Sequence, residues 1–164
     1  YIEIPSDNIE FDQAPAMKAR EITDKTIKLL LSGEYRWGRL NFANGDMVGH
    51  TGNVDATVKA MEVVDECVEA LIKVVHKLNG AVIYTADHGN ADVMFTEKDG
   101  IRSPKTSHTL SPVPFAISFD AGANKFSLTN HVDAGLTNVA ATVMNLLGYQ
   151  APDDYQPSLL NLSE

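Results

Sequence analysis

The chain has 164 residues, of which 44% are hydrophobic and 21% charged, and its formal net charge is −9. This length suits one domain with its own core, and the composition is that of a folded globular protein rather than a disordered one. The acidic charge with scattered Lys and Arg argues against a nucleic-acid partner, and no apolar run is long enough to span a membrane.

The first part of the chain is predicted to be an extended segment, a helix and a short strand. Residues 1–15 contain two prolines and are expected to be extended. Apolar residues at helical spacing predict a helix from Met17 to Leu31, and Ser32-Gly33 ends it. Residues 37–43, WGRLNFA, predict a strand, and a glycine-rich loop follows at residues 44–53.

The strongest helical pattern runs from Val54 to Leu78, with apolar residues on one stripe and Glu and Lys on the opposite face. The stripe comprises Val58, Met61, Val64, Val68, Leu71, Ile72 and Val75. Asn79-Gly80 ends this helix, and the apolar residues 81–85 predict a strand directly after it.

The second half is predicted to contain a strand and a helix separated by polar loops. A polar stretch at residues 91–108 favours a loop with a hairpin around Asp99-Gly100. Residues 112–118 predict another strand. A final helix is expected to begin after an N-cap at Asp133 and to end at Gly148. Its apolar stripe comprises Val139, Val143, Leu146 and Leu147.

Alternation of strands and helices around a long crossover helix predicts an α/β fold with a largely parallel sheet flanked by helices. Sites in such sheets form where strands end. The loops at residues 44–53 and 87–92 both follow predicted strands, so we expect them to lie at the same edge.

The single cysteine, Cys67, cannot form an internal disulfide or a cysteine-based metal cluster. It suits a reducing compartment, and we expect a cytoplasmic protein. Valines around it indicate a packed thiol on a helix rather than a reactive nucleophile. The first residue is Tyr1 and not Met, so we expect the sequence to begin inside a longer protein.

Ligand-type side chains gather in three of the loops: Asp46 and His50 in the first, Asp87 and His88 in the second, and His108 in the third. Carboxylate oxygen and imidazole nitrogen together suit Mn²⁺, Zn²⁺ or Co²⁺, whereas Mg²⁺ generally prefers oxygen alone. Asp46 and His50 are four residues apart and converge if their loop forms one helical turn.

Each of these residues also has a purely structural interpretation. Asp87 could cap a turn, and a lone His88 or His108 is more often a hydrogen-bonded structural residue than a ligand. The joint pattern over three loops is what favours a metal site. His76 on the long helix and His131 before the last helix are expected to be structural.

The segments NFANGDMVGHTG (residues 41–52), YTADHGNAD (84–92) and SHTLSPVPF (107–115), in this order and spacing, resemble the cofactor-independent phosphoglycerate mutases of the alkaline phosphatase superfamily. Residues 3–23 and 133–148 are also similar to that family, so the resemblance covers essentially the whole chain. It implies an alkaline-phosphatase-like α/β fold, present here as the C-terminal part of the metal-binding phosphatase domain.

By this resemblance, Asp46, His50 and His108 would hold one divalent ion, and Asp87 with His88 would bind a second. Mn²⁺ is the ion that the family usually implies, with Mg²⁺, Co²⁺ or Zn²⁺ as alternatives, and no 2,3-bisphosphoglycerate is required.

The implied reaction interconverts 3-phosphoglycerate and 2-phosphoglycerate through a phosphoserine. The resemblance places the nucleophilic serine in an N-terminal half-domain and the substrate-gripping arginines in an inserted transferase domain, both expected to be absent here. We therefore assign no catalytic nucleophile in this chain, leave the substrate-binding residues unassigned, and expect the isolated chain to be inactive. The position of Ser107 beside His108 is interpreted as coincidence.

Two other interpretations remain open. One is another enzyme of the superfamily with the same metal centre, such as a phosphopentomutase, a sulfatase or a nucleotide phosphodiesterase. The other is a non-catalytic folding or interaction module whose loops bind no metal.

Overall fold

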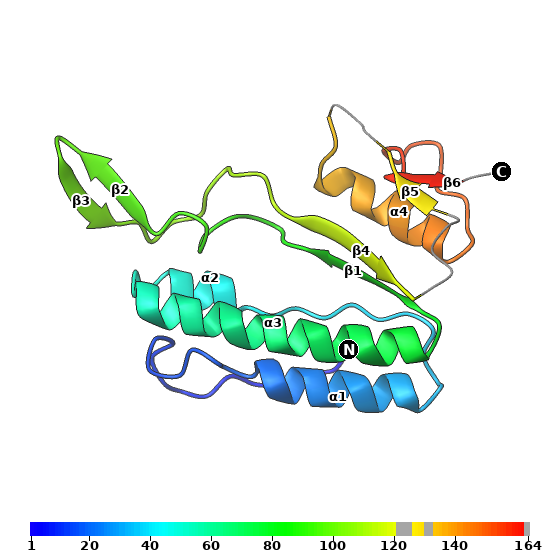
Figure 1. Ribbon diagram of the computed structural model, residues 1–164, viewed down its shortest axis with the longest axis horizontal. Coiled ribbons are helices and arrows are strands. Elements are labelled where there is room, and N and C mark those ends of the chain that lie inside the picture. The colour runs from blue at the N-terminus through cyan, green and yellow to red at the C-terminus, as the bar shows by residue number, and fades with distance from the viewer. Residues whose placement is uncertain (121–125, 130–132, 163–164) are drawn as a thin grey trace.

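The computed structural model describes residues 1–120, 126–129 and 133–162. Three helices, α1 (Ala19–Leu31), α2 (Asn44–Gly49) and α3 (Val54–Lys77), form a layer in which α3 contacts both α1 and α2. The strand pair β1 (Ala81–Thr85) and β4 (Phe115–Phe119) lies along the other side of α3 (Figure 1).

Two smaller units complete the fold. A hairpin of β2 (Phe95–Lys98) and β3 (Ile101–Pro104) extends away from the helical layer (Figure 1). The C-terminal unit consists of β5 (Phe126–Leu128), the short 3₁₀ helix η2 (Leu136–Asn138), α4 (Val139–Leu146) and β6 (Leu160–Leu162). The interpretation of His131 as structural concerns a residue outside the described ones. None of the described helices combines the length and apolar character that crossing a bilayer requires.

The core of the helical layer is built from small and β-branched side chains. Ala19 on α1 and Ala60 on α3 are fully buried, and the two helices pack against each other. Val64 and Leu71 of the predicted apolar stripe are also buried. Val58 and Met61 of that stripe are exposed, because Ala56, Thr57 and Ala60 form the buried face at this end of α3. The thiol of Cys67 is buried in the same face, as predicted.

The helices and strands confirm an α/β architecture, but the described strand pairs are antiparallel rather than parallel. In the β1–β4 pair, Ile83 lies opposite Ile117. The β2–β3 and β5–β6 pairs are antiparallel too. The reason is local: residues 86–114 connect β1 to β4 without a crossover helix, so the chain turns back beside β1, whereas a parallel neighbour needs a crossover.

Two sequence predictions are wrong in detail. Residues 37–43 form no strand, because no described segment pairs with them, and Trp37 is exposed. Asp133 is not the N-cap of the last helix. The chain becomes helical at Leu136, where Oδ1 of Asn138 accepts a 2.8 Å hydrogen bond from the backbone N–H of Gly135. The buried face of α4 is accordingly centred on Ala141 and Thr142 rather than on the predicted stripe.

Other boundaries agree with the sequence pattern. The long helix and β1 begin at Val54 and Ala81, as predicted. The hairpin turns at Asp99-Gly100, where both residues have positive φ, the conformation of a type I′ turn. The segment predicted to be a glycine-rich loop at residues 44–53 contains α2, so Asp46 and His50 do stand one helical turn apart.

Candidate metal centre

The short helix α2 presents Asp46 and His50 on one face. The backbone N–H of His50 donates to the carbonyl oxygen of Asp46 at 3.0 Å, which closes the turn between them. Side chains four residues apart on a helix are neighbours, and here Nε2 of His50 lies 3.1 Å from Oδ1 of Asp46. One turn of helix therefore supplies two potential ligands.

Packing around α2 fixes its position. Val48 is fully buried against Ala56 and Ala60 of α3, with Phe11 and Met17 beside them. The N-terminal segment also holds the helix through Asn44, which is 1% exposed and whose amide donates to the carbonyl oxygens of residues 15 and 16, both at 2.9 Å. The backbone that carries Asp46 and His50 is thus held by core packing and by buried hydrogen bonds.

The second and third loops are joined by backbone and side-chain hydrogen bonds. The N–H of Thr109 donates to the carbonyl oxygen of Gly89 at 2.8 Å, and its hydroxyl donates to the carboxylate of Asp92 at 3.0 Å. A Cβ on Gly89 would lie 2.1 Å from Oγ1 of Thr109, so only glycine lets the loops approach this closely. This junction brings His88 and His108 together.

Three donor atoms from α2 and the third loop form a compact triangle. Oδ1 of Asp46 lies 2.9 Å from Nε2 of His108 and 3.1 Å from Nε2 of His50, and the two imidazole nitrogens are 3.1 Å apart. Around a cation whose ligands lie at about 2.0–2.2 Å, neighbouring ligand atoms at right angles are about 3 Å apart. The triangle therefore has the dimensions of three ligands on one face of an ion.

The ring of His50 is held in a fixed orientation. Its Nδ1 lies 2.6 Å from the carbonyl oxygen of Thr106, which can only accept a hydrogen bond. Nδ1 therefore carries a hydrogen, and in the neutral ring the lone pair is on Nε2, which faces Asp46 and His108. A carbonyl partner on the far ring nitrogen is the usual arrangement for a metal-binding histidine.

The electrostatic surroundings keep Asp46 ionised. Partial burial on its own raises the pKa of the Asp46 carboxyl, but the hydrogen bond from Asn90 and the nearby imidazoles of His50, His108 and His88 lower the pKa below its ordinary value. The carboxylate is consequently available as a negatively charged ligand at neutral pH.

His88 lies closer to this group than the sequence suggested. Its ring stacks on that of His108, with centroids 3.7 Å apart and planes inclined by 20°. Asp46, His88 and His108 each offer a donor atom, and these atoms lie within 4.8 Å of one another. Asp87 stands at the margin: its side chain is 87% exposed, and Oδ1 is 3.8 Å from Nε2 of His88.

The residues present fit a divalent metal ion. The donors are one carboxylate and three imidazoles, which is the mixed oxygen and nitrogen set that Mn²⁺, Co²⁺ and Zn²⁺ accept. Nδ1 of His88 is buried and has no hydrogen-bond partner among the described residues. A buried polar atom without a hydrogen-bond partner is energetically costly, and the described residues provide no partner for this nitrogen.

Several supporting groups were not identified from the sequence. Asn90, whose amide contacts Asp46, stands directly after the predicted Asp-His-Gly turn, and that position was the available signal. Asp92 and Thr109 could have been suspected as loop-joining polar residues only once the two loops were known to meet. The carbonyl of Thr106 left no signal, because every residue has one.

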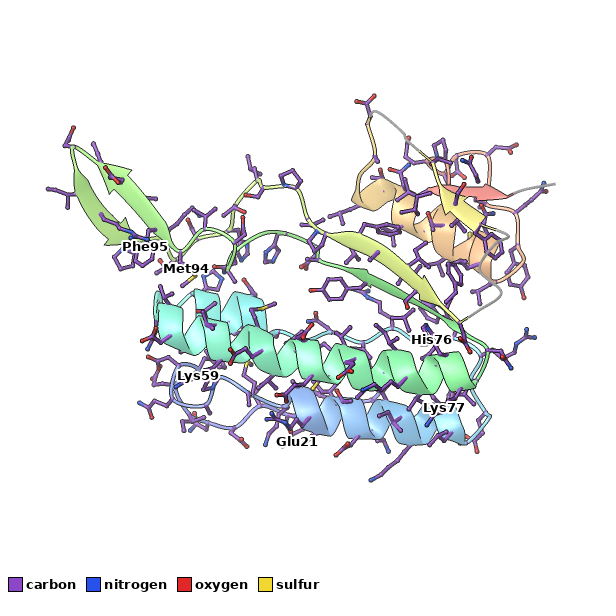
Figure 2. All side chains as sticks on the ribbon, in the orientation of Figure 1. Glu21, Lys59, His76, Lys77, Met94 and Phe95 are labelled. Carbon is purple, nitrogen blue, oxygen red and sulfur yellow. The ribbon has the colours of Figure 1, made fainter. Side chains whose placement is uncertain are left out.

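His76 lies at the opposite end of α3 from the hairpin base and is not part of the candidate metal centre. Figure 2 labels Met94 and Phe95 at the base of the hairpin, above the first turns of α3, and His76 at the opposite end of that helix. Nε2 of His76 lies 3.0 Å from Oγ of Ser118. It is therefore a hydrogen-bonded structural histidine, as predicted.

Comparison with known proteins identifies related sequences. A family model described as Metalloenzyme superfamily matches residues 1–151. The chain is 43% identical, over 99% of its length, to the 2,3-bisphosphoglycerate-independent phosphoglycerate mutase of Trypanosoma brucei brucei. It is 50% identical, over 98% of its length, to the probable 2,3-bisphosphoglycerate-independent phosphoglycerate mutase of Leptospira interrogans. The chain spans 31% of the length of each of these curated relatives.

A solved structure agrees with these matches. The chain superposes with a TM-score of 0.94 on Leishmania mexicana phosphoglycerate mutase, whose crystal structures were determined at low cobalt concentration. The two are 44% identical, and the match covers 99% of this chain and 31% of that one. The resemblance to cofactor-independent phosphoglycerate mutases and the α/β fold class predicted from the sequence are thereby confirmed.

Proposed function

Because the chain belongs to the Metalloenzyme superfamily, we propose that it is part of a cofactor-independent phosphoglycerate mutase, an isomerase that interconverts 3-phosphoglycerate and 2-phosphoglycerate in the cytoplasm. The observation that carries the proposal is the convergence of Asp46, His50, His88 and His108 from three separate segments. The names of the two relatives support the choice of reaction within the superfamily.

The proposed centre holds two divalent ions, with Mn²⁺ as the first choice and Mg²⁺, Co²⁺ or Zn²⁺ as alternatives. Asp46, His50 and His108 would hold one ion, which the 2.9–3.1 Å triangle of their donor atoms supports. Asp87 and His88 would contribute to the other. Both residues stand on the loop after β1: the donor atom of His88 lies within 4.8 Å of those of Asp46 and His108, whereas the carboxylate of Asp87 is largely exposed.

Each side chain has a definable task in phosphoryl transfer. Asp46 contributes negative charge and a donor oxygen, and the Thr106 carbonyl keeps Nε2 of His50 directed at the centre. The stacked rings of His88 and His108 place a proposed ligand of the second ion beside a proposed ligand of the first. When bound, divalent ions supply positive charge that activates a coordinated hydroxyl and neutralises phosphate oxygens.

The remaining catalytic groups are proposed to lie elsewhere in a longer polypeptide. We assign no nucleophile within residues 1–164, and the chain spans only 31% of its curated relatives. A serine that becomes phosphorylated, a further aspartate and the arginines that grip the substrate would come from an N-terminal half-domain and a transferase domain. Splitting the migration into transfer to serine and return to the other hydroxyl gives two ordinary displacements.

The test is mutase activity of the intact protein that carries this chain. Purified protein supplied with Mn²⁺ and 3-phosphoglycerate, without 2,3-bisphosphoglycerate, should form 2-phosphoglycerate; chelation should abolish the activity, and added Mn²⁺ should restore it. Metal-dependent release of phosphate or of another product, with no 2-phosphoglycerate, would instead identify a different enzyme of the superfamily. Absence of bound metal would favour a non-catalytic module.

The isolated chain provides a second test. Residues 1–164 alone should give no turnover with Mn²⁺ and 3-phosphoglycerate, because the proposed nucleophile is not among them. Measurable formation of 2-phosphoglycerate by this piece would overturn that assignment.

A further inference from the structure

Asn90 makes two contacts with a proposed metal ligand from a buried position. It is 4% exposed, and its Nδ2 lies 2.9 Å from Oδ1 of Asp46 and 3.2 Å from the carbonyl oxygen of the same residue. Asp46 and Asn90 belong to different segments, α2 and the loop after β1. One amide group thus connects both the backbone and the side chain of Asp46 to the second loop.

The chemistry of the two partners fixes which way the amide points. A carboxylate oxygen and a peptide carbonyl can only accept hydrogen bonds, so the NH₂ group, and not the amide oxygen, must face Asp46. A hydrogen bond to a charged carboxylate is among the stronger kinds in proteins. The carboxylate is therefore oriented by a donor that holds the same oxygen that contacts His50 and His108.

The space behind Asn90 is closed by Gly49. A Cβ at this position would lie 2.7 Å from Oδ1 of Asn90 and 3.0 Å from its Cγ, closer than such atoms approach. Oδ1 of Asn90 is itself buried and has no hydrogen-bond partner among the described residues. The amide is therefore packed against Gly49 and hydrogen-bonded to Asp46, both on α2, and any larger residue at 49 must displace it.

We propose that Asn90 is a positioning residue that holds the Asp46 carboxylate in its metal-binding orientation, and that the absence of a side chain at Gly49 is required for this contact. The inference rests on the proposed metal centre, since it assigns Asn90 an action through one of the ligands. Partners of metal ligands of this kind typically change metal affinity by about 10–100-fold when removed.

The experiment measures Mn²⁺ binding to the intact protein by electron paramagnetic resonance of the free ion, together with the thermal unfolding midpoint. Asn90→Ala should weaken Mn²⁺ binding by about 10–100-fold. Gly49→Ala, which leaves Asn90 and Asp46 unchanged but displaces the amide, should weaken it in the same direction. This second variant keeps the proposal testable if Asn90→Ala does not fold.

Asn138→Ala is the matched control. Asn138 is also 4% exposed, and its Nδ2 donates to the carbonyl oxygen of Pro157 at 2.8 Å in the C-terminal unit. Its loss should lower the unfolding midpoint without changing the Mn²⁺ dissociation constant. If Asn138→Ala weakens Mn²⁺ binding as much as Asn90→Ala, the effect is general destabilisation and the proposal is wrong.

A double-mutant cycle separates this inference from the metal centre on which it rests. In an Asp46→Ala background, Asn90→Ala should cause no further loss of Mn²⁺ affinity; an undiminished further loss would show that Asn90 does not act through Asp46. If Asp46→Ala itself leaves Mn²⁺ binding unchanged, the metal centre fails together with the inference. If Asp46→Ala weakens binding and neither Asn90→Ala nor Gly49→Ala does, only the inference fails.

Discussion

The two sides of the proposed metal centre are held in place by different forces. Asp46 and His50 stand on α2, whose Val48 is fully buried in the helical core. His88 and His108 stand on loops next to β1 and β4, and neither strand has a fully buried residue. The loop side is held instead by polar contacts, such as the backbone hydrogen bond between Thr109 and Gly89.

This difference implies different responses to mutation. Apolar packing is cooperative, so damage to the helical side should lower the stability of the whole chain. Hydrogen bonds between exposed loops contribute little to overall stability but restrict where their side chains lie. Damage to the loop side should therefore appear first in metal binding and only weakly in unfolding.

The largest expected effect comes from removing a loop-side ligand. In the intact protein, His108→Ala should reduce Mn²⁺ affinity and the proposed mutase activity by more than roughly 100-fold, which is the upper range for residues that act on a metal only through one of its ligands. The thermal midpoint of the metal-free protein should change little, because His108 is about half exposed. His76→Ala, which removes a histidine that pairs with Ser118, is the control. Unaltered metal content in His108→Ala would remove this residue from the site.

A matched pair of valines tests the helical side. Val48→Ala should lower the free energy of unfolding of the chain by about 2 kcal/mol, because the side chain is fully buried. Val82→Ala on β1, which is only half-buried, should cost less than about 1 kcal/mol. Urea unfolding of residues 1–164 measures both. Equal losses would contradict the contrast between a packed helical side and a lightly packed strand side.

The smallest expected effect concerns Asp92 and pH. The hydrogen bond from Ser111 lowers the pKa of Asp92 most, and that from Thr109 and the charge of Lys105 lower it further, against the raising effect of partial burial. A carboxyl whose pKa is lowered on folding stabilises the protein above its unfolded pKa, and this contribution disappears as the pH falls through the folded value.

Asp92→Asn should consequently be slightly less stable than the natural chain at pH 7, and the difference should narrow below about pH 4. The unfolding midpoints of both proteins, measured without metal between about pH 2.5 and pH 7, test this, because carboxyl groups titrate within that range. A difference that stays constant across this range would show that the charge of Asp92 does not hold the loops together.

The fold was predictable wherever a local signal dominates. The apolar stripe from Val54 onward, the Asn79-Gly80 stop and the Asp99-Gly100 turn each act within a few residues, and the corresponding elements are where they were expected. The predictions fail where residues distant in the sequence determine the local structure. Residues 37–43 have strand-like composition but no described partner, and the direction of β4 depends on the connection at 86–114. The short strands β5 and β6 gave no separate pattern.

The site was predictable as a set of ligands but not as an arrangement. The convergence of Asp46 and His50 followed from their spacing. The first two loops meet as expected, but the expectation rested on a strand at residues 37–43 that does not form. The stacking of His88 on His108 depends on the junction at Gly89, which is a tertiary contact. The sequence also could not show that Asp87 would be largely exposed. The assignment of each residue to an ion remains a prediction.

The hairpin β2–β3 has a consequence for how the chain tolerates changes in length. Its two ends meet directly, since the N–H of Lys105 donates to the carbonyl oxygen of Met94 at 2.8 Å. Residues 95–104 thus form a protruding hairpin whose two ends join the rest of the fold at nearly one point. Insertions or deletions at the tip of the hairpin need not alter the distance between His88 and His108. The hairpin is therefore the part of the chain between these two residues that best tolerates a change in length.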